Sequence, residues 1–312
     1  MTAIKTENLS KSYGTIKAVD KLNLEIPENV VFGFLGPNGA GKTTTVRLLT
    51  GFSRPTSGTA QVAGERVADG NLRLQEKTGL LPDVPSFYNW MNGRDFLYLV
   101  GELHRLSGKE KRKRTDELLE LVELKQAARR NIGGYSRGMR QRLGIAQALM
   151  NRPQVLFMDE PTSALDPIGR KEILTLVRQL RETATIFMST HILSDVERVC
   201  DMVGIIDKGK LLAVSSVEAL QKKYARSIFE MEFEEDATPF IETLKTIPWL
   251  AEPQIVIENN TPLVRVRAVD KEHAGKELPR LASESGLTLR RYELMLPDLE
   301  EIFVKILNGG GN

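Results

Sequence analysis

Short apolar runs that alternate with helical patterns organise the first two thirds of the chain. Residues 1–35 are expected to form short strands, and the runs at 30–35, 155–160 and 185–190 are continuous and rich in β-branched or aromatic residues. Such runs are typical of strands buried on both faces. Apolar positions recur at helical spacing between them, as in 43–50. Strands that alternate with helices predict an α/β fold with a mainly parallel sheet and helices on both faces.

The stretch 86–150 has a different pattern and predicts a helical region. One helical pattern begins at 95–100, and apolar residues recur at helical spacing from 118 to 124. A basic run at 109–114 precedes the second pattern. It is either a contact for a partner or a lipid, or simply the solvated face of a helix, and the second interpretation is favoured.

The last third begins after residues 221–226, which are interpreted as a linker. Phe229, Met231 and Phe233 alternate with glutamates, which is the period of a half-buried strand. We then expect a helix over 239–250, a hairpin turn at 259–262, a helix over 277–285 ended by Gly286, a strand over 287–296 and a helix opened by Pro297. This order fits a small ferredoxin-like α+β domain.

Composition excludes several classes of protein. The chain has 43 Lys and Arg against 41 Asp and Glu, a net charge of +2, whereas nucleic-acid binders usually show a strong basic excess. Its single cysteine, Cys200, excludes an intrachain disulfide and a zinc cluster, and is interpreted as a small buried apolar residue. No uncharged apolar run approaches the roughly 18 residues of a membrane-spanning helix, and the N-terminus lacks the apolar core of a signal peptide. We therefore expect a cytosolic protein. If it works at a membrane, another chain must provide the membrane-spanning part.

The clearest motif follows the first buried run. Residues 36–43 read Gly-Pro-Asn-Gly-Ala-Gly-Lys-Thr and match the phosphate loop G-x-x-x-x-G-K-[ST]. Glycines let backbone N–H groups surround an anion, and the following helix adds partial positive charge. Lys42 would reach the terminal phosphates, and Thr43 would offer its hydroxyl to Mg²⁺. The alternative is a glycine-rich turn without a ligand.

Two carboxylates end the second buried run. Asp159 and Glu160 would be costly there unless both charges have partners. In a phosphate-loop protein, Asp159 would hold Mg²⁺ directly or through water, and Glu160 would orient and polarise the attacking water. The alternative is that both face solvent at the end of a strand.

With these motifs in order, residues 1 to about 220 resemble the ATP-binding cassette (ABC) transporter ATPases. The family signature, usually written LSGGQ, is present in altered form at 135–139, where Tyr135, Arg137 and Met139 depart from it. His191 matches the switch histidine that contacts the γ-phosphate. The D-loop is matched at 163–166.

The resemblance implies roles for single residues. Tyr13 would stack on adenine, and Glu160 and His191 would be catalytic. The other nucleotide-binding residues are Gly36, Pro37, Asn38, Gly39, Ala40, Gly41, Lys42, Thr43 and Thr44. The signature residues that would meet the partner's ATP are Ser136, Arg137, Gly138 and Met139, and Asp166 is the predicted residue of the D-loop.

One position departs from the family near the metal. The family normally has a glutamine after the strand near 79–82, where this chain has Asp83. A glutamine reaches Mg²⁺ and water, whereas an aspartate is shorter and charged and could approach the ion through water. The implied metal ligands are Thr43, Asp159 and Asp83.

The resemblance implies an ABC ATPase domain over 1–222, with a helical subdomain at about 86–150 that grips a membrane partner, and an accessory domain over 223–312. It implies an ATP-hydrolysing subunit that uses Mg²⁺ and drives transport through a separate permease, most like drug-, antibiotic- and ion-exporting systems. One full set of motifs implies a head-to-tail dimer with itself or a similar cassette. The chain would lie in the cytoplasm, peripheral at the inner face of the cell membrane, with no nucleic-acid partner expected.

Two other functions stay open. A soluble ABC ATPase that acts on DNA or ribosomes usually has two cassettes or a long coiled-coil insertion, and neither is visible. A nucleotide-gated scaffold that hardly hydrolyses ATP is motivated by the altered signature and Asp83. The intact residues that argue against it are Lys42, Asp159, Glu160 and His191. The last domain could regulate the dimer, contact the permease or stabilise the fold.

Overall fold

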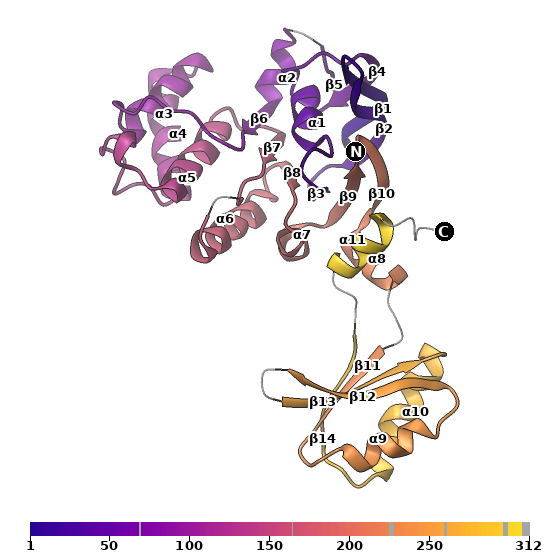
Figure 1. Cartoon of the computed structure of the whole chain (residues 1–312). Coiled ribbons are helices and arrows are strands. Elements are labelled where there is room, and N and C mark those ends of the chain that lie inside the picture. Colours follow the sequence, from indigo (N-terminus) through magenta and orange to yellow (C-terminus); the bar gives the residue numbers. More distant parts are fainter. Residues whose placement is uncertain (69, 164, 225–227, 259–260, 296–298, 308–312) are drawn as a thin grey trace. The chain divides into compact units, whose positions relative to one another are not determined.

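The computed structural model (Figure 1) describes residues 1–68, 70–163, 165–224, 228–258, 261–295 and 299–307. Two compact units divide the chain. The first contains Met1–Val217 and, from the described end of the chain, Ile306 and Leu307, and the second contains Glu218–Lys305. The functional division into 1–222 and 223–312 stays a prediction.

A six-stranded sheet forms the centre of the first unit, in the order β10-β9-β3-β8-β7-β6. All its pairs are parallel except β10 with β9. The strands are β3 (Val31–Leu35), β6 (Thr78–Leu81), β7 (Val155–Asp159), β8 (Thr185–Thr190), β9 (Met202–Asp207) and β10 (Lys210–Ser216). Every residue of β3, β7 and β8 is buried, which confirms the three apolar runs as strands covered on both faces.

Alternate side chains of β3 point to helices on opposite faces of this sheet. Phe32 and Phe34 share a buried cluster with Val46 of α1 (Lys42–Leu49), whereas Gly33 faces Val196 of α7 (Leu193–Val199). The predicted parallel sheet with helices on both faces is therefore confirmed. The remaining helices that follow the strands are α2 (Leu72–Lys77) and α6 (Pro167–Leu180).

A second, antiparallel sheet has the order β2-β1-β4-β5. Its strands are β1 (Thr2–Tyr13), β2 (Ile16–Pro27), β4 (Ser57–Val62) and β5 (Glu65–Arg66). The prediction of short strands at the N-terminus is wrong for β1 and β2, which pair along nearly their whole length. Shifts of register let this pairing continue past irregular positions.

The helical region contains α3 (Gly93–Leu103), α4 (Gly108–Leu121), a 3-10 turn (Ile132–Gly134) and α5 (Arg137–Ala148). Ser107 and Glu110 form a capping box that starts α4. Within the basic run, Lys113 is exposed and pairs with Glu117 one turn later, as on a solvated helix face.

The second unit has the predicted ferredoxin-like order. Its antiparallel sheet runs β12-β13-β11-β14, and α9 and α10 cover one face of it (Figure 1). The elements are β11 (Ile228–Phe233), α9 (Thr238–Lys245), β12 (Leu250–Glu258), β13 (Thr261–Ala268), α10 (Lys271–Glu284) and β14 (Leu289–Leu294). The hairpin is confirmed, because Glu258 pairs with Thr261, but the predicted turn at 259–262 was too long, since Thr261 and Pro262 already belong to β13. Residues 259–260 lie outside the described residues.

Three details of the second unit correct the sequence prediction. The predicted linker over 221–226 is wrong for residues 221–224, because these residues continue helix α8 (Val217–Tyr224). Val217 and Leu220 are buried along one side of this helix. The helix expected over 239–250 ends at Lys245, and Leu250 already starts β12. Helix α10 begins earlier than expected, because Asp270 caps its N-terminus.

The alternating pattern of β11 hides a buried charge. Glu230 is 2% exposed, although it lies on the face opposite Phe229 and Met231. Its carboxylate pairs with Arg265 at 2.7 Å and with Arg291 at 2.6 Å. On an ordinary half-buried strand, water would hydrate the outward-facing carboxylate. Here the two arginines pair with it instead.

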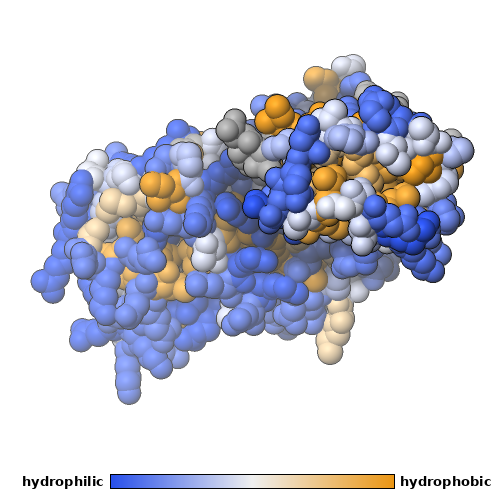
Figure 2. All heavy atoms as spheres, turned by 90° about the horizontal axis from the view of Figure 1, so that it is seen from below, coloured by the Kyte–Doolittle hydropathy of each residue, from blue (hydrophilic) through white to orange (hydrophobic). Residues whose placement is uncertain are grey.

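The last described helix, α11 (Leu299–Leu307), carries the predicted apolar side chains, and Pro297 lies outside the described residues. None of the helices in the described part of the chain is both long and apolar enough to cross a membrane. Polar side chains cover most of the face in Figure 2, with apolar ones in scattered groups.

Candidate functional site

The phosphate loop between β3 and α1 is shaped by strands that lie far from it in sequence. A side chain on Gly41, whose φ is +109°, would place its Cβ 2.3 Å from the Ala18 carbonyl oxygen of β2. A side chain on Gly36 would meet the Ile206 carbonyl oxygen of β9 at 2.3 Å. Because both oxygens belong to the backbone, only glycine fits at these two positions.

The turn between β9 and β10 holds the loop by its backbone. The Gly209 N–H donates to the Ala40 carbonyl at 2.9 Å, and the Asp20 N–H donates to the Gly209 carbonyl at 2.8 Å. Gly209 has a φ of +78°, which favours glycine. The loop is therefore fixed between β2 and this turn.

Lys42, at the start of α1, has a buried ammonium group with three partners. Its Nζ donates to the carbonyl oxygens of Gly36 at 2.8 Å and Pro37 at 3.2 Å, and lies 3.1 Å from Glu160 Oε1. The Lys42 and Glu160 side chains are 6% and 12% exposed. A charge buried to this degree needs an anionic partner, and a phosphate group would be a second one.

Glu160 and His191 follow adjacent strands, β7 and β8, and meet at the carboxyl edge of the sheet. His191 Nδ1 lies 2.9 Å from Glu160 Oε2. Glu160 has a φ of +47° and its N–H donates to the Ser189 carbonyl at 3.0 Å, which turns its side chain toward Lys42. The structure thus brings the two predicted catalytic residues together beside the phosphate loop.

Asp159 is buried beside this group, at the last position of β7. Its Oδ1 accepts a hydrogen bond from the Ser189 hydroxyl. Asp83, after β6, is exposed and accepts a hydrogen bond from the Ser163 hydroxyl at 3.2 Å. The two carboxylates predicted to serve one metal therefore have different partners.

A cleft of about 620 Å³ opens over the phosphate loop, a volume within the usual range for small-molecule sites. The predicted residues that line it are Asn38, Gly39, Gly41, Lys42, Thr43, Thr44, Asp83, Glu160 and His191. The lining residues that the sequence analysis missed are Ile16, Lys17, Ala18 and Lys208, while Ser163 was identified only as part of the D-loop. The cations Lys17 and Lys208 add positive charge to the lining of the cleft.

The chemistry of the donors fits a magnesium nucleotide. Mg²⁺ prefers oxygen ligands and usually takes one or two carboxylates together with substrate phosphates and water. Thr43 lines the cleft and is exposed there, whereas the Asp159 carboxylate is buried at the end of β7 and does not line it. Among the described residues, no three His, Cys, Asp or Glu side chains form a metal site on their own, so a cation here would depend on the phosphates.

The signature residues do not line this cleft. Ser136 caps the N-terminus of α5 and accepts a hydrogen bond from the Met139 N–H at 3.2 Å, with Arg137 and Gly138 in the same first turn. Asp166 caps α6 and accepts from the Gly169 N–H at 3.3 Å. Neither the signature nor Asp166 therefore contacts the chain's own cleft, although Ser163 of the D-loop lines it.

Tyr13 also lies outside the lining of the cleft. Its ring is 51% exposed, with the Lys11 ammonium 4.9 Å from its centre. Ile16, three residues along the same hairpin, lines the cleft and is 69% exposed. Stacking of Tyr13 on adenine stays a prediction.

The signature helix is tied to the loop that follows Glu160. Gln141 of α5 is buried and donates to the Pro161 carbonyl at 2.9 Å. Farther along, Arg170 of α6 donates to Asp195 of α7 at 2.6 Å, and Asp195 is 1% exposed. These contacts couple the segments after β7 and β8, and the sequence analysis did not predict them, because they join residues 20 and 25 positions apart.

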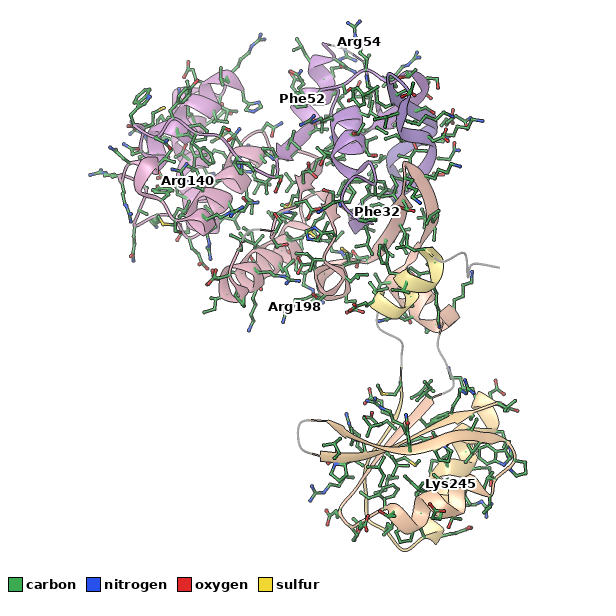
Figure 3. The ribbon with its side chains drawn as sticks, in the orientation of Figure 1. Phe32, Phe52, Arg54, Arg140, Arg198 and Lys245 are labelled. Atoms are coloured by element: carbon green, nitrogen blue, oxygen red, sulfur yellow. The ribbon has the colours of Figure 1, made fainter. Side chains whose placement is uncertain are left out.

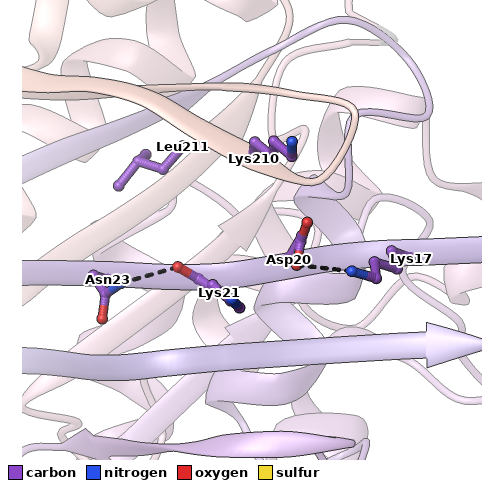
Figure 4. A pocket seen from close by; sticks show the side chains of 6 residues that line it. All are labelled: Lys17, Asp20, Lys21, Asn23, Lys210 and Leu211. Atoms are coloured by element: carbon purple, nitrogen blue, oxygen red, sulfur yellow. Dashed lines mark hydrogen bonds and ion pairs between the residues drawn. The ribbon is translucent and has the colours of Figure 1, made fainter.

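A second hollow, of about 430 Å³, lies between β2 and β10 and shares Lys17 with the cleft (Figure 4). Lys21 and Lys210 also line it, and Lys17 pairs there with Asp20 at 3.5 Å. It contains no part of the phosphate loop, so we assign the chemistry to the cleft.

Comparison with known proteins places the chain among a large group of relatives. A protein-family model described as ABC transporter matches residues 19–163. An uncharacterized ABC transporter ATP-binding protein, YxlF of Bacillus subtilis (strain 168), is 38% identical over 98% of this chain and 99% of its own length. The bacitracin transport ATP-binding protein BcrA of Bacillus licheniformis is 37% identical over 99% of this chain and 98% of its own.

A third relative is the daunorubicin resistance ATP-binding protein DrrA3 of Streptomyces coeruleorubidus, 33% identical over 98% of this chain and 96% of its own. Among solved structures, the ATP-binding subunit of an ABC transporter is 27% identical over 72% of this chain and 93% of its own, with a TM-score of 0.65. A dimeric bacterial ABC transporter cassette, MJ0796, is 26% identical over 69% of this chain and 98% of its own, with a TM-score of 0.63.

Proposed function

We propose that this chain, which belongs to the ABC transporter ATP-binding proteins, powers the export of an antibiotic or a similar drug-like compound through a separate permease. Membership of the family makes it an ATP-binding and ATP-hydrolysing transporter subunit. The proposed cargo is supported by the relatives named for bacitracin transport and daunorubicin resistance, which match nearly the whole chain, its last third included.

The convergence of Lys42, Glu160 and His191 in one cleft is the observation that carries the proposed mechanism. Lys42 binds the terminal phosphates of ATP, and Glu160, released from Lys42, orients the attacking water and accepts its proton. His191 contacts the γ-phosphate from the end of β8. Thr43 and Asp159 would hold Mg²⁺, which would supply positive charge against the charge that develops on the phosphates.

A complete site requires two cassettes. Ser136 and its neighbours lie away from the chain's own cleft, at the exposed N-terminus of α5, where N–H groups can face an anion. We infer a head-to-tail dimer, with itself or with a similar cassette, in which each signature closes on the partner's ATP. A dimeric cassette among the structural relatives supports this arrangement.

The permease contact is proposed for the exposed aromatic segment before α3. Tyr88 and Trp90 are 55% and 74% exposed, and their ring centres lie 5.9 Å apart. Exposed aromatic pairs of this kind are typical anchors of protein interfaces. Phe87 fixes the segment by packing edge-on against Phe96 of α3, with ring centres 5.1 Å apart.

This segment is hydrogen-bonded to the signature helix. Arg140 of α5, labelled in Figure 3, donates to Asn89 Oδ1 at 3.0 Å. The Asn89 carbonyl accepts a second hydrogen bond from the Gly133 N–H at 2.9 Å. Docking at Tyr88 and Trp90 would therefore act on the helix that carries the signature. The chain would be cytoplasmic and peripheral at the inner face of the membrane.

Gentle isolation of the tagged chain from its native membranes tests the proposal. A stoichiometric multi-span protein should accompany the chain, and Trp90→Ala should reduce its recovery, whereas Leu103→Ala, an equally exposed position at 74%, should not. Recovery of ribosomes or DNA in place of a membrane protein would contradict the transport assignment. If a membrane protein is recovered, the antibiotics to which the chain and this permease together confer resistance would identify the class of cargo.

A further inference from the structure

Asp83 is hydrogen-bonded to the loop that carries Glu160. Its Oδ1 accepts from the Ser163 hydroxyl at 3.2 Å, and both residues line the nucleotide cleft. The pairing of β6 with β7 explains their proximity, because these parallel neighbours end at the same edge, with Leu81 beside Met158. The contact thus joins the ends of two adjacent strands.

Ser163 is in turn bonded to Glu160. The Ser163 N–H donates to the Glu160 carbonyl at 3.3 Å and closes a tight turn. Glu160 lies in the left-handed region, with a φ of +47°, a conformation that costs free energy for any residue with a side chain. A group that holds Ser163 therefore helps to keep this turn, and with it the direction of the Glu160 carboxylate.

We propose that Asp83 is a positioning residue that acts on Glu160 through Ser163, and that it is not a ligand of Mg²⁺. The inference rests on the proposed role of Glu160. A carboxylate at this position accepts the serine hydrogen bond well, since charge strengthens such bonds. The described residues contain no cluster of three metal-binding side chains, and the predicted ligands Thr43 and Asp159 would supply the hydroxyl and the one carboxylate that Mg²⁺ usually takes from a protein beside substrate phosphates.

Steady-state ATP turnover of the purified full chain, with ATP and Mg²⁺ each titrated, tests this role. Asp83→Ala and Ser163→Ala should each lower kcat by about tenfold, because a misdirected Glu160 acts on water less well. The double variant should lose no more than either single one, since both remove the same hydrogen bond. Asp83→Asn should retain kcat within about threefold, because its amide oxygen still accepts. The Mg²⁺ concentration for half-maximal turnover should stay the same in all four.

Two results would overturn the inference. One is a rise of about tenfold or more in the Mg²⁺ requirement of Asp83→Asn without a similar rise in Ser163→Ala, which would make Asp83 a metal ligand. The other is multiplication of the two single effects in the double variant. Glu160→Gln separates the two proposals, because unchanged turnover in that variant would remove the role of Glu160 itself.

A hydrogen-bonded pair in the second unit provides the control. The Thr238 hydroxyl donates to Asp236 Oδ1 at 2.6 Å, and both residues are exposed. Asp236→Ala and Thr238→Ala remove the same chemical groups and should leave kcat unchanged. If these variants also lose turnover, the loss seen in Asp83→Ala and Ser163→Ala would be explained by general destabilisation.

Discussion

The Lys42 ammonium and the Glu160 carboxylate form a 3.1 Å ion pair, and the other oxygen of Glu160 lies 2.9 Å from His191 Nδ1. The group proposed to act on water is thus held by the group proposed to bind phosphate. An entering nucleotide must compete with Glu160 for Lys42. Phosphate binding and release of the catalytic carboxylate are coupled by this single contact.

Replacement of Glu160 by glutamine should separate binding from hydrolysis. We expect kcat of Glu160→Gln to fall by about a thousandfold, because an amide cannot accept the proton of water. ATP should bind at least as tightly, since Lys42 loses an anionic competitor. Phosphate release and equilibrium binding of a fluorescent ATP analogue measure the two effects. Turnover at the level of the unmodified chain would contradict the assignment.

Loss of Lys42 should abolish binding and also weaken the fold. We expect Lys42→Ala to reduce ATP affinity by about a hundredfold or more, because the phosphates lose a cationic partner while the Glu160 carboxylate stays beside them. The free energy of unfolding should fall by about 2 kcal/mol, because the largely buried Glu160 carboxylate loses Lys42 and keeps only His191. Arg47→Ala, at an exposed position of the same helix, is the control for nucleotide binding and urea unfolding. Equal losses in both variants would exclude a specific role for the ammonium.

The thiol of Cys200 should make stability fall at alkaline pH. Burial raises the pKa of this thiol far above its usual range, and the carboxylates of Asp201 and Asp195 add to the shift. The folded chain keeps a proton that the unfolded chain loses above about pH 8.5, so this stabilisation is present at lower pH and declines as the pH rises. Urea unfolding from about pH 8 to about pH 10 should show a smaller decline for Cys200→Ala. Parallel declines in the two proteins would contradict the prediction.

Glu230 should stabilise the second unit. Its carboxylate joins Arg265 to Arg291, and since Arg291 keeps its contacts with Glu232 and Glu293, Glu230→Ala should destabilise this unit by about 1.5 kcal/mol. Glu234→Ala is the matched control, because Glu234 is exposed and makes one 3.1 Å contact with Arg290. Native-state proteolysis followed by mass spectrometry measures the opening of this unit. Equal protection in both variants would show that the buried charge contributes nothing.

Local patterns were sufficient to predict the parts of the molecule that depend on neighbours in sequence. The buried strands were predictable because β3, β7 and β8 are apolar on both faces, and the phosphate loop because its glycines and Lys42 are contiguous. The order of elements in the second unit was predictable from the change of period after Phe229.

Contacts between distant segments were not predictable in this way. Lys208 reaches the cleft only because β9 lies beside β3. The sequences of these two strands do not indicate that they are neighbours in the sheet. Glu230 resembled a solvent-facing residue, since its two arginines come from other strands. Lys222 and Lys223 suggested a linker, although the buried Leu220 beside them continues the apolar side of α8.

The backbone contact between Gly209 and Ala40 has a consequence for protein engineering. Residues 36–43 form a portable motif in sequence, but the hydrogen bond that holds them comes from a turn near the opposite end of the first unit's sequence. Transplanting residues 36–43 alone into another scaffold would transfer the sequence of the motif but not the hydrogen bond that makes it rigid. A substitution at Gly209 would likewise have the phenotype of a damaged phosphate loop, so variants in this turn should be classified with those of the nucleotide site.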